Sequence, residues 1–135
     1  MTDKELLNID LCSRLPYIDT MVRWQDEDYH MIDIGFGRVT LVKPFMSITA
    51  GSPLITEVKP YLRPLEDMTE EELKEFYIIE YSCEHPMVWK KPQYNWRFTV
   101  NGIDWLNKHH FDYRGLIPKE LAIKVTEEND PYNIK

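Results

Sequence analysis

Nine prolines divide this 135-residue chain into short intervals, and they limit where a helix or strand can run. Proline fixes φ, lacks a backbone N–H donor and pushes the residue before it into an extended conformation, so regular elements tend to end beside it. Pro16 ends a stretch with leucine at four-residue spacing, Pro44 and Pro60 close two β-prone runs, and Pro86 follows a charged helical stretch. The prolines therefore predict short elements with tight connections.

Short β-prone runs fill the segment 16–58. They cover residues 20–24, 29–34, 38–42 and 54–58, and polar or glycine-containing turns separate the first three. Short strands at this regular spacing predict a small antiparallel sheet, with an SH3-like meander or partly closed barrel as the expected form. A sheet of this size needs a helix packed on one face to be stable.

Two packed helices are expected after the sheet, beyond an extended connector at 59–65 that contains two prolines. The first helix lies within 66–84, where Thr69 is a candidate N-cap and Glu72 completes a capping box. The second covers 101–110 with Asn101 as its N-cap. One or two helical turns are also plausible before Pro16, and 126–135 is expected to be a loose tail. We predict one α+β domain over residues 1–135.

The bulk composition is that of an ordinary globular domain, with 43% hydrophobic and 29% charged residues. A chain of this length buries enough surface to fold without a metal or disulfide staple. Cys12 and Cys83 lie far apart in the sequence and form no metal-binding spacing, so free thiols are expected. The sequence shows neither a membrane-spanning run nor a secretion signal, which predicts a cytoplasmic protein.

The net charge of −7 is concentrated in one stretch. Residues 66–84 hold eight acids against the single base Lys74, while the acids and bases elsewhere cancel. Non-specific binding to nucleic acid is disfavoured, because it requires cations that neutralise phosphates. The acidic helix is either a solvated face or a surface for a basic partner.

A first candidate site interleaves cations with aromatic rings. It comprises Trp89, Lys90, Lys91, Tyr94, Trp96 and Arg97. This pattern is typical of surfaces that stack bases and attract phosphates. The phosphate-cradling glycine motifs of nucleotide-binding proteins are missing from the sequence. The alternative is an amphipathic hairpin, with Tyr94, Trp96 and Phe98 alternating on one sheet face, whose aromatic side chains pack on the acidic helix.

A second candidate site is the dense polar run His109, His110, Asp112, Tyr113 and Arg114. It could contact a ligand or partner, or supply a general acid and base. Adjacent helical residues point about 100° apart, which disfavours one metal ion shared by the two histidines. A structural role is the alternative, with Asp112 and Arg114 holding the following turn by side-chain hydrogen bonds. We predict no catalytic residue, metal or cofactor.

Three blocks of the chain resemble a family of small uncharacterised proteins from gut Bacteroidetes and their phages and prophages. The blocks are IDLCSRLPY at 9–17, KPYLRPLEDMTEEE at 59–72 and DWLNKHHFDYRGLI at 104–117, which together cover just over a quarter of the chain. The resemblance implies no activity, cofactor or catalytic residue. It implies a mobile-element, cytoplasmic setting in a bacterial host, which favours an interaction or host-takeover role over a metabolic enzyme.

Three functional hypotheses follow. The leading one is a non-enzymatic protein-binding or adaptor domain that uses the acidic helix 66–84 or the segment 89–98. The second is a small-ligand or nucleotide binder that sequesters a host defence signal, again through 89–98 and the run from His109 to Arg114. The third is a hydrolase that uses His85 or His109.

Overall fold

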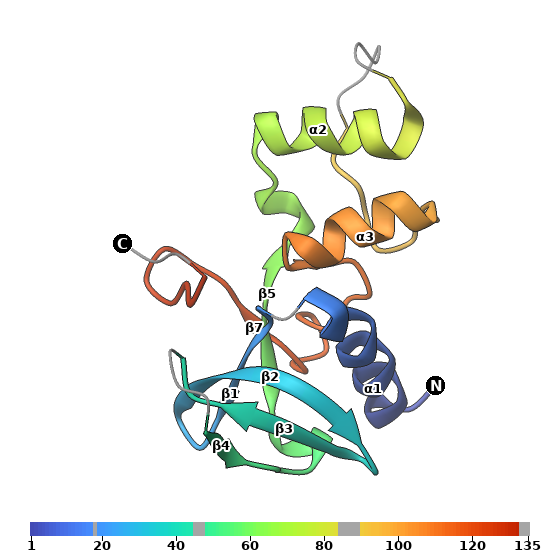
Figure 1. Ribbon diagram of the computed structural model, residues 1–135. Coiled ribbons are helices and arrows are strands. Elements are labelled where there is room, and N and C mark those ends of the chain that lie inside the picture. The colour runs from blue at the N-terminus through green and yellow to red at the C-terminus, as the bar shows by residue number, and fades with distance from the viewer. Residues whose placement is uncertain (18, 45–47, 84–89, 133–135) are drawn as a thin grey trace.

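Three α-helices and one seven-stranded sheet make up the residues that the computed structural model describes, which are 1–17, 19–44, 48–83 and 90–132. The expected α+β class is therefore confirmed. In Figure 1 the helices α2 (Glu70–Tyr81) and α3 (Val100–Lys108) stack at one end of the molecule, and the strands β1 to β4 curve around the other end. Helix α1 (Asp3–Arg14) lies beside the sheet.

The sheet has the strand order β4-β3-β2-β1-β5-β6, with β7 paired to β5 outside this path. Neighbouring strands from β4 to β5 are antiparallel, whereas β6 and β7 run parallel to β5. The sheet is thus mixed, not purely antiparallel as expected, and the SH3-like form stays a prediction. The strands are β1 (Met21–Trp24), β2 (Glu27–Gly35), β3 (Arg38–Val42), β4 (Thr49–Gly51), β5 (Lys59–Pro64), β6 (Phe111–Asp112) and β7 (Ile123–Lys124).

Two predicted segments exchange their roles in the structure. The run 54–58, expected to be a strand, contains the 3₁₀ turn η2 (Ile55–Glu57), and the expected connector 59–65 contains the central strand β5. Proline is tolerated near the ends of a strand, and β5 has Pro60 and Pro64 there. The residues between them donate and accept normally, for example Arg63 N–H to His110 O at 2.8 Å.

The helix count is three, not two, because the first 15 residues form more than one or two turns. Thr2 caps α1 in a full capping box with Glu5, and Arg14 provides a favourable cation in the last turn. Leu7 and Leu11 are buried against the sheet, which adds tertiary packing to a helix of only 12 residues.

The capping box predicted for α2 is confirmed, with Thr69 as N-cap and Glu72 at the third helical position. Helix α3 begins slightly earlier than expected. Its N-cap is Thr99, whose hydroxyl accepts the Gly102 N–H at 3.1 Å, so Asn101 lies inside the helix. Shorter 3₁₀ turns are η1 (Leu15–Tyr17) and η3 (Leu65–Asp67).

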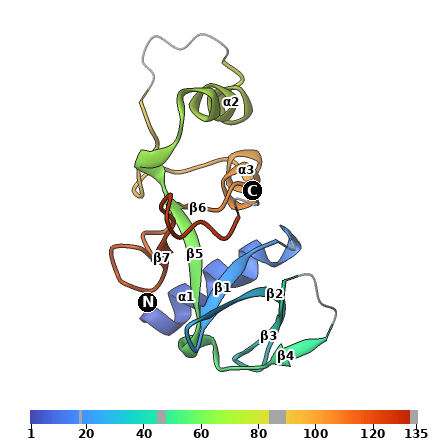
Figure 2. The ribbon, with the colours of Figure 1, turned by 90° about the vertical axis from the view of Figure 1, so that its left-hand side faces the viewer.

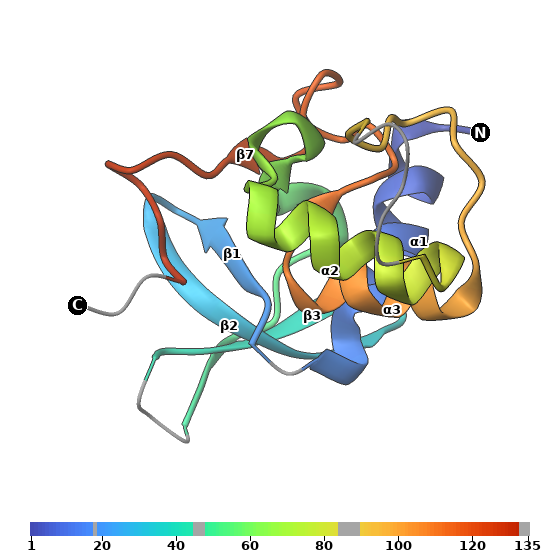
Figure 3. The same cartoon turned by 90° about the horizontal axis from the view of Figure 1, so that it is seen from above.

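Three hydrophobic clusters form the core of the described residues, and the smallest contains Met21, Tyr61 and Val125. Figure 2 shows β5 running from the strands β1 to β4 toward α2 and α3, and the two larger clusters lie at these two ends of the molecule. The first joins α1 to the strands β1 to β3, and Leu62 of β5 contributes to it. The second lies between α2 and α3, which overlap when viewed from above (Figure 3), and it is built largely from aromatic rings. The second cluster contains Phe76, Tyr77, Trp105, Phe111 and Tyr113.

Candidate functional site

A cleft of about 560 Å³ opens where β5 ends. Three segments that are distant in the sequence form its walls, namely 64–66 at the end of β5, 91–94, and 117–118 together with Lys124 of β7. This volume is in the range of sites that hold a small ligand or a short stretch of peptide. We refer to it as the proline-rich cleft, because Pro64, Pro92 and Pro118 all line it.

The segment 90–98 reaches this cleft as an irregular chain, so the predicted strand with alternating aromatic rings is wrong. The Tyr77 hydroxyl donates to the Lys90 carbonyl at 2.7 Å and accepts the Lys90 N–H at 3.1 Å. A turn follows, closed by the Trp96 N–H on the Gln93 carbonyl. These contacts satisfy backbone groups that a sheet would otherwise pair.

The aromatic residues of this segment face different surroundings. Tyr94 lines the cleft, whereas Phe98 packs on Phe76 and Tyr113 with ring centroids 5.9 and 6.3 Å away. Trp96 is half-buried, and Arg97 is exposed. Of the six residues proposed from the sequence, only Lys91 and Tyr94 line the cleft among the described residues, and Trp89 lies outside the described part of the chain.

The cleft carries more positive than negative charge. Lys91 Nζ donates to the Glu66 carbonyl oxygen at 2.6 Å, and Lys124 Nζ lies 3.8 Å from a carboxylate oxygen of Glu66. The backbone carbonyl leaves the Lys91 charge unneutralised, and the 3.8 Å pair is exposed and weak. Among the described residues, the charged side chains of the lining are these two lysines and one glutamate, which favours anionic groups in the cleft.

Tyr94 brings a neutral hydrogen-bonding group to the same cleft. Burial raises the pKa of Tyr94 to about 12, and the charges of Asp112 and Glu66 add to the shift. The phenol therefore keeps its proton at physiological pH and stays neutral, while its ring offers an apolar surface. Binding, not proton transfer, is what this arrangement supports.

His109 and His110 belong to a separate cleft of about 370 Å³, with Arg63 and Tyr132 in its lining. The His109 ring packs on Trp105 with centroids 4.2 Å apart. Burial lowers the pKa of His109, against the opposing charges of Glu75 and Glu72 on α2. Among the described residues, no hydroxyl or thiol hydrogen-bonds to its ring, and His85 of the hydrolase hypothesis lies outside them.

His110 is held in an unusual position. Its backbone has a φ of +63°, its ring stacks on Tyr132 at 3.7 Å, and its Nε2 lies 3.2 Å from the Asp19 carboxylate. Burial lowers the pKa of His110 to about 4, although Asp19 opposes the shift. Tyr132 in turn accepts the Met21 N–H, so the segment expected to be a loose tail is anchored at this residue.

The three residues after Phe111 do not join the histidines. Arg114 points toward α1, Asp112 toward the loop that follows it, and Tyr113 toward α3, where its hydroxyl donates to Asn107 Oδ1 at 2.9 Å. The Asp112 carboxylate accepts backbone N–H groups of residues 115, 116 and 117, each at 3.0 Å, as the structural interpretation of the sequence predicts. Arg114 donates to Asp10, which also forms a fully buried ion pair with Arg14 at 2.8 Å. These contacts form a structural network that fixes α1 against the loop after β6.

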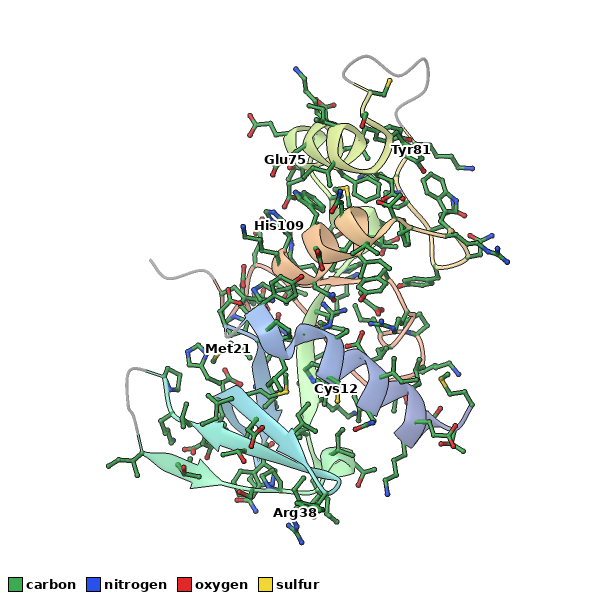
Figure 4. All side chains as sticks on the ribbon, turned by 45° about the vertical axis from the view of Figure 1, so that its right-hand side comes forward. Cys12, Met21, Arg38, Glu75, Tyr81 and His109 are labelled. Atoms are coloured by element: carbon green, nitrogen blue, oxygen red, sulfur yellow. The ribbon has the colours of Figure 1, made fainter. Side chains whose placement is uncertain are left out.

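The acids of α2, for which the sequence left open a solvated face or a partner surface, are partly used inside the molecule. Glu72 binds Arg63 through two 2.7 Å contacts, and Glu75 accepts the Trp105 indole N–H at 2.9 Å. Figure 4 shows Glu75 on α2 above His109, the residue that follows α3. Glu80 is buried and holds the N-cap residue Thr99. Only Glu70 and Glu71 of the first turn stay exposed on this helix without such a role.

Sequence reasoning missed the cleft residues 64–66, 117–118 and 124, and also Asp19 and Tyr132 beside His110. No local pattern marks them, because the fold brings them together from distant segments. The Asp10–Arg14 pair could have been found, since its spacing of four places both side chains on one face of a helix.

No helix among the described residues is both long and apolar enough to cross a bilayer. The same residues hold no cluster of three or more side chains that could ligate a metal ion. Comparison of the chain with protein-family models, with curated proteins and with solved structures finds no match.

Proposed function

We propose that this protein is a non-enzymatic binding domain whose partner is another protein, and that an extended acidic segment of the partner occupies the proline-rich cleft. The observation that carries the proposal is the composition of the cleft, which is lined by two lysines and Tyr94 together with three prolines. Of the two surfaces that the sequence offered, this favours the segment 89–98 over the acidic helix.

The acidic character of the partner follows from charge complementarity. The net charge of −7 is concentrated in residues 66–84, whereas the described lining of the cleft has two lysines against one glutamate and so a local excess of positive charge. Complementary charges steer a partner to the correct face and suppress wrong ones. An extended segment fits because aromatic-lined grooves are a recurring way in which domains bind extended peptides, and Tyr94 supplies an aromatic ring here.

The chemical groups in the cleft support binding more than catalysis. Its lining contains no serine, cysteine or histidine among the residues described, and its tyrosine stays protonated. The resemblance to proteins of Bacteroidetes phages and prophages points the same way and would place the domain in the host cytoplasm.

Selection of a phage-displayed random peptide library on the purified protein tests the proposal. Enriched peptides should be rich in Asp and Glu, and their affinity should fall as the salt concentration rises. The double variant Lys91→Glu, Lys124→Glu should bind them about tenfold more weakly or worse. Lys4→Glu, Lys59→Glu makes the same charge change at exposed lysines outside the cleft and should leave binding unaltered.

Two results would contradict the proposal. One is enrichment of peptides without acidic residues. The other is equal weakening by the cleft variant and its charge-matched control, since that would indicate only a general electrostatic attraction.

A second candidate function uses the same cleft for a small anionic ligand such as a nucleotide. It is favoured by the volume of about 560 Å³ and by an aromatic ring beside two cations. A thermal-shift screen against nucleotides distinguishes it, because a ligand at a hundred times its Kd should stabilise the protein by about 2.7 kcal/mol. No shift at millimolar nucleotide would eliminate this candidate.

A further inference from the structure

Phe36 occupies the tip of the β2–β3 hairpin and is entirely exposed, at 107% of its reference area. Gly35 and Arg38 form the last strand pair, so Phe36 and Gly37 are the two residues of the turn. Both have positive φ, +53° and +73°, the combination found in the tight hairpin turns that prefer Asn-Gly.

The folded chain gains nothing visible from phenylalanine at this position. A bulky side chain with positive φ is strained, and glycine or asparagine would satisfy the turn better. A fully exposed ring also contributes no burial to the core. Folding alone would therefore select a different residue, which points to a role outside the fold.

The hairpin tip is also held rigidly by the segment that precedes β5. The Gly37 carbonyl accepts the Ile55 N–H at 2.9 Å, and the Val39 N–H donates to the Pro53 carbonyl at 2.9 Å. Arg38 Nη1 donates to the Ser52 carbonyl at 2.9 Å. Because hydrogen bonds hold this turn in one conformation, the Phe36 ring loses little conformational freedom when it binds, which is the property of a preorganised anchor.

The apolar tip is wider than one ring and has a single strong charge beside it. Leu54 pairs with Arg38 through an isolated bridge and is 42% exposed. The Arg38 guanidinium is exposed and forms no ion pair among the described residues, and Figure 4 shows it directed away from the body of the molecule. An aromatic residue next to an arginine is the composition of interface hot spots.

We infer that Phe36 is the anchor of a second protein-binding surface, which inserts into an apolar socket on a partner protein whose rim carries a carboxylate facing Arg38. This surface is distinct from the proline-rich cleft, whose lining residues come from 64–66, 91–94, 117–118 and 124. With two surfaces the domain would connect two proteins, as an adaptor does.

A protein socket fits the tip better than a membrane or a second copy. One aromatic ring and one cation on a chain of charge −7 make a poor membrane anchor, since stable anchoring takes two signals. Two hairpin tips meeting each other would bury far less than the roughly 1,200 Å² that a stable dimer needs.

Photocrosslinking tests the inference. The variant Phe36→p-benzoyl-phenylalanine is irradiated in an extract of the cells that naturally contain the protein. The control carries the same substitution at Val100, which is another exposed apolar residue and lies on α3. The expected result is one discrete adduct with a different protein, formed at position 36 only and mapped to an apolar pocket with Asp or Glu at its rim. The partner is then produced in pure form.

Binding to the pure partner completes the test. Phe36→Ala should weaken it at least tenfold, Phe36→Leu less, and Arg38→Glu by several-fold, while Lys91→Glu should leave it unchanged. Phe36→Asn should have an unfolding midpoint in urea at or above that of the wild type. A stable Phe36→Asn variant shows that the loss of binding does not result from a loss of folding. The inference is overturned if no adduct is specific to position 36, or if the adduct forms with a second copy of this chain or with lipid. It is also overturned if Phe36→Ala binds the partner as tightly as the wild type, or if Phe36→Asn unfolds at a lower urea concentration than the wild type.

Discussion

Replacing Gly102 by alanine should destabilise the protein, against the usual effect of this substitution. Gly102 lies inside α3, where alanine in place of glycine normally stabilises a helix by about 1 kcal/mol. Here a Cβ atom would lie 1.8 Å from Oε2 of the buried Glu80. The carboxylate must move, and this breaks its contacts with the Thr99 N–H at 2.7 Å and the Thr99 hydroxyl at 2.8 Å.

The expected size follows from those two contacts. Each hydrogen bond to a charged group contributes about 1.5–3 kcal/mol, so losing both costs about 3–6 kcal/mol. Subtracting the alanine gain leaves a net loss of about 2–5 kcal/mol in the free energy of unfolding. The loss also loosens the N-cap of α3, because Thr99 is the cap residue.

Urea unfolding followed by tryptophan fluorescence measures this free energy. The variants are Gly102→Ala, Glu80→Ala and the double variant, and Gly35→Ala is the control because a Cβ there meets no atom within 4 Å. In the Glu80→Ala background, Gly102→Ala should become stabilising, by about 1 kcal/mol. A Gly102→Ala protein as stable as the wild type, or the same effect in both backgrounds, would refute the reasoning.

Three further changes test other parts of the structure. Asp10→Ala leaves the buried guanidinium of Arg14 without its carboxylate and should cost about 3–5 kcal/mol of unfolding free energy in urea, whereas an unchanged midpoint would contradict a buried pair. His110 is neutral when folded because burial lowers its pKa to about 4, so its contribution to stability is complete above its unfolded pKa of about 6.5 and is lost as the pH falls toward 4. Asparagine tolerates the positive φ at position 110, so His110→Asn should keep the fold and reduce the change in unfolding free energy between those pH values. An unaltered dependence on pH would assign it to other groups. Tyr132→Phe removes the hydroxyl that bonds the backbones of β1 and β5 and should cost about 1–3 kcal/mol, with loss of hydrogen-exchange protection at Met21 as the specific sign.

The parts of the fold that follow from local chemistry were predictable. The capping box of Thr69 and Glu72, the strands around the turn at 25–26, and the hairpin closed by Phe36 and Gly37 all depend on residues a few positions apart. The strand β5 was not predictable in the same way. Its prolines favour a connector when considered alone, and only pairing with β1, β6 and β7 shows that they lie at tolerated positions.

The candidate site depends even more on tertiary structure. The polar run from His109 to Arg114 looked like one constellation, but the left-handed backbone at His110 and the strand β6 turn successive side chains toward different surroundings. The histidines face Trp105 and Tyr132, whereas Asp112 and Arg114 face the loop and α1.

Amino-acid order alone determines the class of this domain, its capped acidic helix and the places where turns interrupt it, because propensity, capping and proline stereochemistry act over a few residues. Only the folded chain decides that Lys91, Tyr94 and Lys124 share one cleft and that Phe36 is fully exposed at a hairpin tip outside it. Those positions depend on contacts between segments distant in the sequence, and the free energy of such contacts comes from burial and packing that no local pattern encodes.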